Sequence, residues 1–174
     1  MNELDNFKYF NNKTPFFTLS GLKTPARIVN VVDGDTLTLI IPIFDSYYKF
    51  YTRISGIDTC ETHSKDEKIK ELGLKAKYRV LELLLSPPKN IIEIMGITNK
   101  QIIDIFDKDV YIINIECGDF DKYGRLLANV FINDGRSIAS VLLEEKLAYK
   151  YEGKTKLTEE EQFYNMIDGN IINK

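Results

Sequence analysis

The spacing of apolar residues changes near residue 64 of this 174-residue chain, from a two-residue period to a helical one. Before that point, apolar side chains alternate with polar or hydroxyl side chains in three runs, ARIVNVV, TLTLIIP and KFYTRISGI. Such alternation is typical of half-buried β-strands, and Asp33-Gly34 after the first run favours a tight turn. The first third of the chain therefore predicts three consecutive strands.

A helix is predicted after these strands. Ser64–Glu67 fits a capping box, and Pro87 and Pro88 end the helix. Gly73 in its middle costs roughly 1 kcal/mol relative to alanine. Two explanations of this glycine are open: a close approach of the helix to the sheet, or simple tolerance of its cost to the helix. The apolar residues at helical spacing are Ile69, Leu72, Ala76, Val80, Leu83 and Leu84.

The rest of the chain predicts two more strands, VYIINIEC and LLANVFI, joined by the turn DFDKYGR. Two helices follow, SIASVLLEEKLA and LTEEEQFYNMID. Between residues 89 and 108, NIIEIM fits a short strand and NKQIIDIFDK a short helix. We expect an irregular extension over residues 1–24 and one α+β domain over residues 25–174. Its five strands can close into a barrel with about three packed helices.

Composition narrows the functional classes. No apolar run approaches the ~20 residues needed to cross a bilayer, so we expect no membrane association. MNELDNFKYFNNK has no basic start followed by an apolar run, which predicts an intracellular protein. Abundant Ile, Asn and Lys fit an AT-rich genome, as in a virus-encoded protein. The net charge of −3 means that any polyanion is bound by a local cluster of cations. We expect a monomer.

The stretch GIDTCETH, residues 56–63, raises the question of a metal site. A zinc site needs three or four protein ligands, and the chain has no histidine besides His63. The other cysteine, Cys117, ends an apolar strand, where a free cysteine is usually a small core residue. Cys60 and His63 are therefore interpreted as bystanders, and a soft metal site is rejected.

A hard metal site fits the pattern better. Asp33 and Asp35 lie in DGDT at a tight turn, and Asp58 ends a neighbouring predicted strand. Asp-Gly at a strand end is most often only a turn, but the two neighbourhoods together are more specific. Two carboxylates, a backbone carbonyl and waters are the oxygen ligands that a hard divalent cation prefers.

Three further charged residues have ordinary interpretations when taken singly. Arg53 lies within a strand and would point into solvent, Arg125 would pair with Asp121, and Glu61 would cap the following helix. Their joint occurrence beside a hard-metal pattern favours a functional site. Most lysines of the first helix alternate with acids and are interpreted as a solvated face.

Five motifs in order resemble the staphylococcal nuclease (thermonuclease) family over roughly residues 26–151: VVDGDTLTL, RISGIDTCE, ELGLKA, DKYGRLLANV and LLEEKLA. The resemblance implies an OB-type five-stranded barrel and calcium-dependent hydrolysis of DNA and RNA phosphodiesters that leaves 3′-phosphate ends. Mg²⁺ or Mn²⁺ with added waters would also suit the ligands. No motif in the sequence indicates side chains that recognise the edges of bases, so we expect little preference for particular nucleotide sequences. The alternative is a catalytically silent OB-fold module that binds nucleic acid or a protein.

The resemblance also implies roles for individual residues. The metal ligands are Asp35, Asp58 and the main-chain carbonyl of Thr59, with Asp33 nearby but without a ligand role. Glu61 is the general base or water-positioning residue, and the scissile phosphate is held by Arg53 and Arg125. The residues expected to contact the rest of the substrate are Tyr123, Tyr151 (or Tyr149, which the spacing also allows), Lys154 and Lys156.

This chain departs from the family pattern in four places, one of which is a short turn between Cys117 and Asp121. Cys60 stands where the family usually has proline, which removes a rigid lead-in to Glu61 but no ligand. The segment around residues 89–108 and the N-terminal extension have no clear counterpart in the family.

Overall fold

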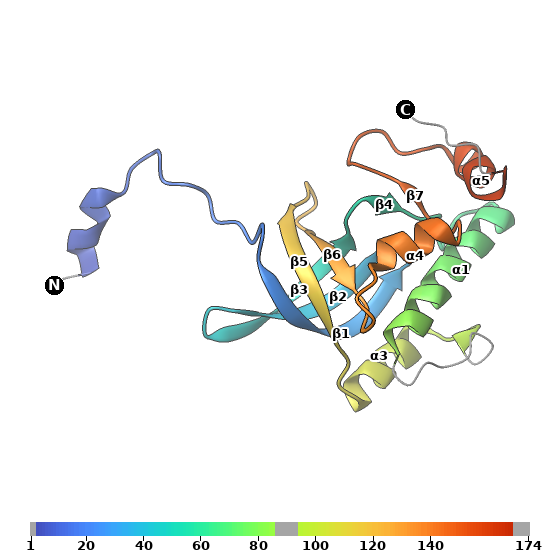
Figure 1. Ribbon diagram of the computed structural model, residues 1–174, viewed down its shortest axis with the longest axis horizontal. Coiled ribbons are helices and arrows are strands. Elements are labelled where there is room, and N and C mark those ends of the chain that lie inside the picture. Colours follow the sequence, from blue (N-terminus) through green and yellow to red (C-terminus); the bar gives the residue numbers. More distant parts are fainter. Residues whose placement is uncertain (1–2, 86–93, 169–174) are drawn as a thin grey trace.

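The computed structural model describes residues 3–85 and 94–168 (Figure 1). Five strands form a closed barrel in the order β1-β2-β3-β6-β5, which confirms the predicted α+β barrel. All neighbouring pairs are antiparallel except β3 and β6, which are parallel. The barrel strands are β1 (Lys23–Asp33), β2 (Thr36–Ile43), β3 (Ser46–Ile54), β5 (Ile112–Phe120) and β6 (Leu126–Phe131).

Alternation along the strands builds the core. Leu37, Leu39 and Ile41 of β2 have no exposed side-chain surface, because every second residue of a strand faces the barrel interior. Two register shifts in β1 bend this strand as it runs from β5 to β2. Helices cover one side of the barrel, and the N-terminal segment leads away from it (Figure 1). That segment, predicted to be irregular, contains a 3₁₀ helix over Glu3–Tyr9.

Helix α1 (Glu67–Leu84) is capped differently from the sequence prediction. Asp66 is the N-cap, and its carboxylate accepts the N–H groups of Lys68 and Ile69. The capping box predicted at Ser64 is therefore wrong, because the Ser64 hydroxyl instead accepts the N–H of Asp66. A carboxylate cap satisfies free amides and interacts favourably with the helix dipole.

The predicted helix over residues 99–108 is confirmed as α3 (Asn99–Lys108), which begins with a capping box formed by Thr98 and Gln101. The strand predicted over residues 90–95 lies mostly outside the described residues. Helix α4 (Ile138–Glu144) is shorter than predicted, and α5 (Glu159–Asp168) is the last described helix. In the described part of the chain, no helix is long and apolar enough to span a membrane.

The segment after α4 forms a strand that the sequence did not predict. Lys146 adopts a positive φ of 56°, which turns the chain out of the helix. Residues Tyr149–Lys150 then form β7, which pairs antiparallel with β4 (Ile57–Asp58) in a separate two-stranded sheet. This pairing places Tyr149 opposite Asp58.

Gly73 of α1 packs directly against the chain segment that carries Glu61. A Cβ at this position would lie 2.6 Å from the carbonyl oxygen of Cys60 and 2.9 Å from the carbonyl carbon of Glu61. Of the two explanations that the sequence allowed for Gly73, a close approach is therefore the one present, although it involves the loop after β4 rather than the barrel sheet.

Gly73→Ala is expected to lower the free energy of unfolding by about 1–3 kcal/mol, because the methyl group overpacks against backbone that cannot move aside freely. This outcome opposes helix propensity, which favours alanine by roughly 1 kcal/mol. Urea denaturation measures the effect, with Lys75→Ala on the exposed face of α1 as the control. An unchanged or increased stability of Gly73→Ala would contradict the prediction.

Candidate active site

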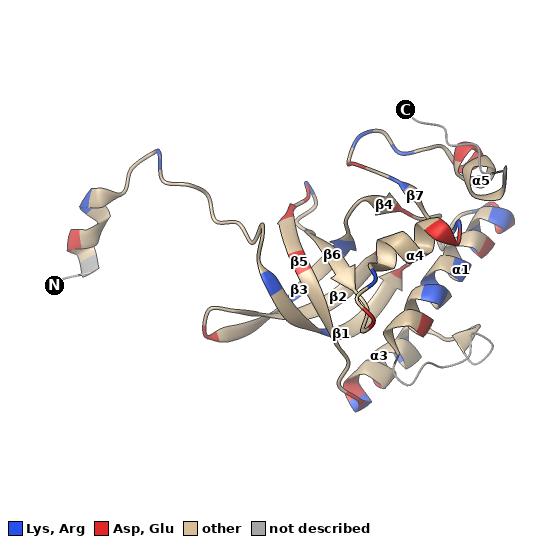
Figure 2. Cartoon of the chain, in the orientation of Figure 1, with Lys and Arg blue, Asp and Glu red and all other residues tan. Residues whose placement is uncertain are grey.

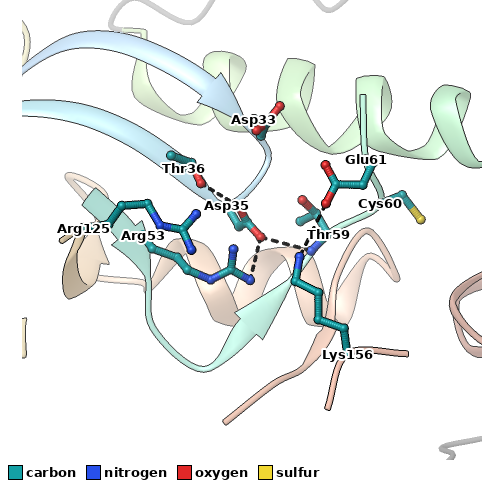
Figure 3. A pocket seen from close by; sticks show the side chains of 9 residues that line it. All are labelled: Asp33, Asp35, Thr36, Arg53, Thr59, Cys60, Glu61, Arg125 and Lys156. Carbon is teal, nitrogen blue, oxygen red and sulfur yellow. Dashed lines mark hydrogen bonds and ion pairs between the residues drawn. The ribbon is translucent and has the colours of Figure 1, made fainter. Parts of the chain in front are cut away.

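Segments far apart in sequence form one pocket at the end of the barrel (Figure 3). The β1–β2 turn, β3, the loop after β4, the start of β6 and the segment before α5 all contribute to it. Its volume is about 330 Å³, including the open mouth. The residues that line it are Asp33, Asp35, Thr36, Arg53, Thr59, Cys60, Glu61, Arg125 and Lys156.

The β1–β2 turn is held by close packing around Gly34. A Cβ here would lie 2.7 Å from the Ala76 Cβ on α1 and 3.1 Å from the Thr59 Cγ2. Only glycine lets the turn approach this closely. Asp35 is consequently placed beside the loop after β4, where its Oδ2 accepts the N–H of Thr59 at 3.3 Å.

Arg53 is buried between two carboxylates and is only 6% exposed. Its Nη2 lies 3.1 Å from the Asp35 Oδ2 and also donates to the Asp58 Oδ1. The ring of Tyr151 covers the guanidinium, with 5.5 Å between the guanidinium carbon and the ring centroid. The interpretation of Arg53 as a solvated side chain is therefore wrong, because β7 and the segment after it cover this part of the strand.

The two carboxylates ionise differently. Burial raises the pKa of Asp35 to about 6, against the attraction of Arg53. Burial also acts on Asp58, but hydrogen bonds from Tyr149 and Arg53 outweigh it and lower the pKa of this carboxyl. Above about pH 6 both side chains are anionic, as a cation ligand must be.

Tyr149 is a site residue that sequence reasoning left as an alternative. Its side chain is buried, and its hydroxyl donates to the Asp58 Oδ2. Burial and this bond raise the pKa of Tyr149. Tyr151, two residues later, is the one that lies over Arg53. The sequence shows two tyrosines two residues apart, and either could border the pocket. The pairing of β4 with β7 puts Tyr149 against Asp58 and Tyr151 over Arg53.

Tyr149→Phe is expected to lower the free energy of unfolding by about 1–3 kcal/mol at neutral pH, because it leaves a buried carboxylate oxygen without this donor. The lowered pKa of Asp58 contributes stability that is present above the ordinary value of 3.8 and lost as pH falls through the folded-state value. The difference between wild type and variant should therefore shrink at acid pH.

Urea denaturation at neutral and acid pH measures this difference. Tyr151→Phe is the matched control, since the Tyr151 hydroxyl donates to the carbonyl of exposed Lys154 at 2.9 Å. A Tyr149→Phe variant as stable as this control at neutral pH would refute the assignment of the hydrogen bond.

Arg125 forms the predicted ion pair with Asp121 and also lines the pocket. Its Nε donates to the Asp121 Oδ2 at 2.8 Å, as the sequence suggested, and Asp121 also accepts the Arg125 N–H. The bond to Nε leaves the terminal amino groups directed at the pocket (Figure 3). Tyr123, 72% exposed, lies with its ring centroid 5.5 Å from the Arg125 guanidinium carbon.

Glu61 and Lys156 face each other across the pocket mouth. Glu61 is exposed and does not cap α1, a function that Asp66 performs. The Lys156 Nζ lies 3.4 Å from the Glu61 Oε1 and 3.1 Å from the Asp58 Oδ1. Lys154 is exposed, and it contacts the site through its carbonyl rather than its ammonium group.

The two residues interpreted as bystanders take no part in these contacts, although Cys60 is among the residues that line the pocket. Cys60 is buried, with its Sγ 3.6 Å from the Met166 Sδ, and His63 is exposed. Burial raises the pKa of the Cys60 thiol to about 12, so this side chain is a poor thiolate ligand at neutral pH.

The lysines of α1 mostly form a solvated face, as expected. Basic and acidic residues are interspersed along this helix (Figure 2), and Lys75 pairs with Glu71 at 2.8 Å. Lys77 is the exception. It is buried, and its Nζ donates to the Asn99 Oδ1 at 2.6 Å, which joins α1 to the start of α3.

The donor set suits a hard cation. Asp35 and Asp58 share the guanidinium of Arg53, so their carboxylates converge, and Thr59, the residue after Asp58, lines the pocket beside them. No group of three or more His, Cys, Asp or Glu side chains in the described residues is arranged to hold a metal. Two carboxylates, a carbonyl and waters or substrate oxygens remain compatible with Ca²⁺ or Mg²⁺.

Comparison with known proteins assigns the family. Residues 51–168 match the staphylococcal nuclease homologue family, and the chain belongs to it. It is 33% identical to endonuclease YncB of Bacillus subtilis (strain 168) over 143 residues, 77% of this chain and 55% of that protein. It is 30% identical to the uncharacterized protein MJ1439 of Methanocaldococcus jannaschii over 141 residues, 72% of this chain and 56% of that protein. The chain thus spans about half the length of these curated relatives.

Proposed function

We propose that this protein is a metal-dependent nuclease that hydrolyses phosphodiester bonds in DNA, RNA or both with little sequence preference. The observation that carries the proposal is one pocket lined by two arginines, Asp35 and the exposed Glu61, with the buried Asp58 paired to Arg53 beneath it. Membership of the staphylococcal nuclease family and the similarity to a named endonuclease support it.

The arginines are suited to binding the phosphate. A guanidinium offers a planar fork of donors that matches two phosphate oxygens and stays charged at any physiological pH. Arg53 is held rigidly by Asp35 and Asp58, whereas Arg125 is held through Nε and presents its amino groups to the pocket. The two side chains hold the diester and neutralise the charge that grows on its oxygens during attack.

Glu61 is suited to handling the proton of the attacking water. Its side chain is exposed at the pocket mouth, where water reaches it. Glu61 accepts a proton from water as the new P–O bond forms. The bond from phosphorus to the 5′ oxygen breaks with its electron pair, and that oxygen takes a proton from solvent. The products are a 3′-phosphate end and a 5′-hydroxyl end.

Asp35, Asp58 and the Thr59 carbonyl would hold Ca²⁺, with Mg²⁺ or Mn²⁺ as alternatives. A cation bound there supplies neutralisation of the phosphate and orientation of the water. Lys156 lines the pocket, and Tyr123 and Tyr151 lie against its two arginines. These three residues and Lys154 would contact the rest of the nucleotide. The rival function is a silent module that binds nucleic acid or protein, and the presence of every proposed catalytic side chain in one pocket favours the enzyme.

The deciding experiment is digestion of single-stranded DNA, duplex DNA and RNA with Ca²⁺, Mg²⁺, Mn²⁺ or chelator, followed by analysis of the ends. Cleavage that chelator abolishes and that leaves 3′-phosphates is expected, and Glu61→Gln should reduce it. Binding without cleavage under every condition would reject the nuclease and establish the binding module.

Lys156→Gln is expected to bind Ca²⁺ about 2–5-fold more tightly than wild type in the absence of nucleic acid. The Lys156 ammonium group contacts Asp58 and Glu61, and a partly exposed ion pair of this kind is worth ~0.2–1 kcal/mol. Calorimetric titration measures the affinity, with Lys154→Gln as the control. Equal affinities of the two variants would show that Lys156 does not compete with the cation.

A further inference from the structure

The outer face of β3 continues from the pocket to the tip of the β2–β3 hairpin. Alternate residues of a strand point to the same face, so Tyr47, Lys49 and Tyr51 share the face of Arg53. Their partners on β2 are Pro42, Ile40 and Thr38, in register with the Arg53–Thr36 pair. The hairpin extends away from the helices (Figure 1), so the helices do not cover its tip. These three residues are called the β3 track.

The rings of the β3 track are exposed. Tyr47 is 74% exposed and Tyr51 is 66% exposed, and the lysine between them is also exposed. Such rings contribute apolar surface that folding leaves in water, which marks a binding surface when several occur together.

The track is continuous with the candidate active site. β3 pairs in parallel with β6, with Thr52 opposite Leu126. Tyr51 and Arg125 each precede this pair by one residue, and Arg125 lines the pocket. Tyr123 is also exposed and lies against the Arg125 guanidinium.

The charges of the hairpin suit a polyanion. Between Thr36 and Arg53 the only acidic residue is Asp45 at the tip, while Lys49 and Arg53 lie on the track face. Aromatic rings that alternate with cations provide stacking surfaces for bases and contacts for the phosphates between them. A ring on a strand can stack only on a base that is not already covered by its neighbours in a duplex.

We propose that the β3 track binds single-stranded nucleic acid, with bases stacked on Tyr51 and Tyr47 and a phosphate at Lys49. The inference rests on the proposed nuclease function and specifies its substrate as an unpaired strand that leaves the pocket along β3. From Arg53 to Tyr47 the strand covers roughly 20 Å at ~3.3 Å per residue. That length corresponds to about six nucleotides at ~3.4 Å per stacked step.

The test is fluorescence anisotropy with labelled single strands of about ten and about three nucleotides, and with a ten-base-pair duplex. The full chain carries Glu61→Gln and is kept in chelator, so that the strands stay intact. Tyr47→Ala/Tyr51→Ala should bind the longer single strand at least ~20-fold more weakly, because each lost stacking contact costs at least ~5-fold. The three-nucleotide strand, which is too short to reach Tyr47 from the pocket, should lose less affinity than the longer strand, and the preference for single strands over duplex should fall.

Tyr48→Ala is the matched control. Tyr48 is a neighbouring exposed tyrosine, but it pairs with Ile41, whose side chain faces the barrel interior. Its loss should leave affinity unchanged. Lys49→Gln should reduce the slope of log affinity against log salt concentration by about 0.7, the value for one phosphate contact on a single strand. Circular dichroism confirms that each variant is folded.

Equal affinity of the double variant and wild type for the longer strand would overturn the proposal that the β3 track binds nucleic acid. So would a loss of dimerisation in the double variant by analytical ultracentrifugation, which would make this face a contact between two copies of the chain. If wild type binds through the track but cuts no nucleic acid with any metal, the track stands and the nuclease proposal fails.

Discussion

Arg53→Met is expected to lower the free energy of unfolding by about 3–5 kcal/mol, because it leaves buried carboxylates without their shared counter-charge. Arg53 is nearly inaccessible and contacts both Asp35 and Asp58. Urea denaturation measures the loss. Arg79→Met is the control, since Arg79 forms its ion pairs with Glu82 and Glu145 nearer the surface and should cost less than about 1 kcal/mol.

A second variant separates charge from packing. Asp35→Asn in the Arg53→Met background removes one of the two buried charges and should recover part of the lost stability. Because burial already raises the pKa of Asp35 to about 6, the Arg53→Met protein should also be more stable at acid pH than at neutral pH, where its carboxylates are ionised. If Arg53→Met were as stable as the Arg79→Met control, Arg53 would not be the counter-charge of the site.

Arg125→Ala is expected to lower kcat by ~10²–10³-fold with little change in stability, because it removes preorganised donors from the developing charge of the transition state. Arg125 is partly exposed, and its partner Asp121 also accepts two backbone N–H groups, so the turn persists without the side chain. Steady-state cleavage of a single-stranded substrate measures the effect.

Arg136→Ala is a closely matched control for this variant. Arg136 also follows a turn and also donates its Nε to a neighbouring carboxylate, that of Asp134, at 2.8 Å, but it is not among the residues that line the pocket. Full activity is expected of it. An Arg125→Ala protein that cleaves as fast as Arg136→Ala would exclude Arg125 from the reaction. Loss of Arg53 is thus expected to lower mainly the stability of the protein, and loss of Arg125 is expected to lower mainly the rate of cleavage.

Most of the barrel was predictable because strand signals are local. The alternation around Leu37, Leu39 and Ile41 places those side chains in the core whatever the rest of the chain does. The same holds for α3, whose cap is formed by Thr98 and Gln101, three residues apart. The start of α1 was misplaced because Ser64 and Asp66 are both good N-cap residues, and the structure uses the second.

The candidate site was only partly predictable. The motifs around Asp35, Asp58 and Arg125 indicated the residue types needed to handle a phosphodiester, and the family resemblance ordered them. The burial of Arg53 between carboxylates was not foreseen, because its position in β3 indicates only a side chain outside the barrel. What covers that position is a segment almost a hundred residues later in the chain.

Periodicity, turn residues and caps act over a few neighbouring residues. For that reason the five strands, most of the helices and the order of the charged motifs could be predicted from the sequence. Three groups of contacts could not be predicted in this way: Tyr149 donates to Asp58, Tyr151 covers Arg53, and Lys156 pairs with Asp58 and Glu61. These contacts depend on the pairing of β4 with β7, two strands of two residues each. Strands so short carry no pattern of their own, and they form because closure of the barrel and packing of α4 bring them together.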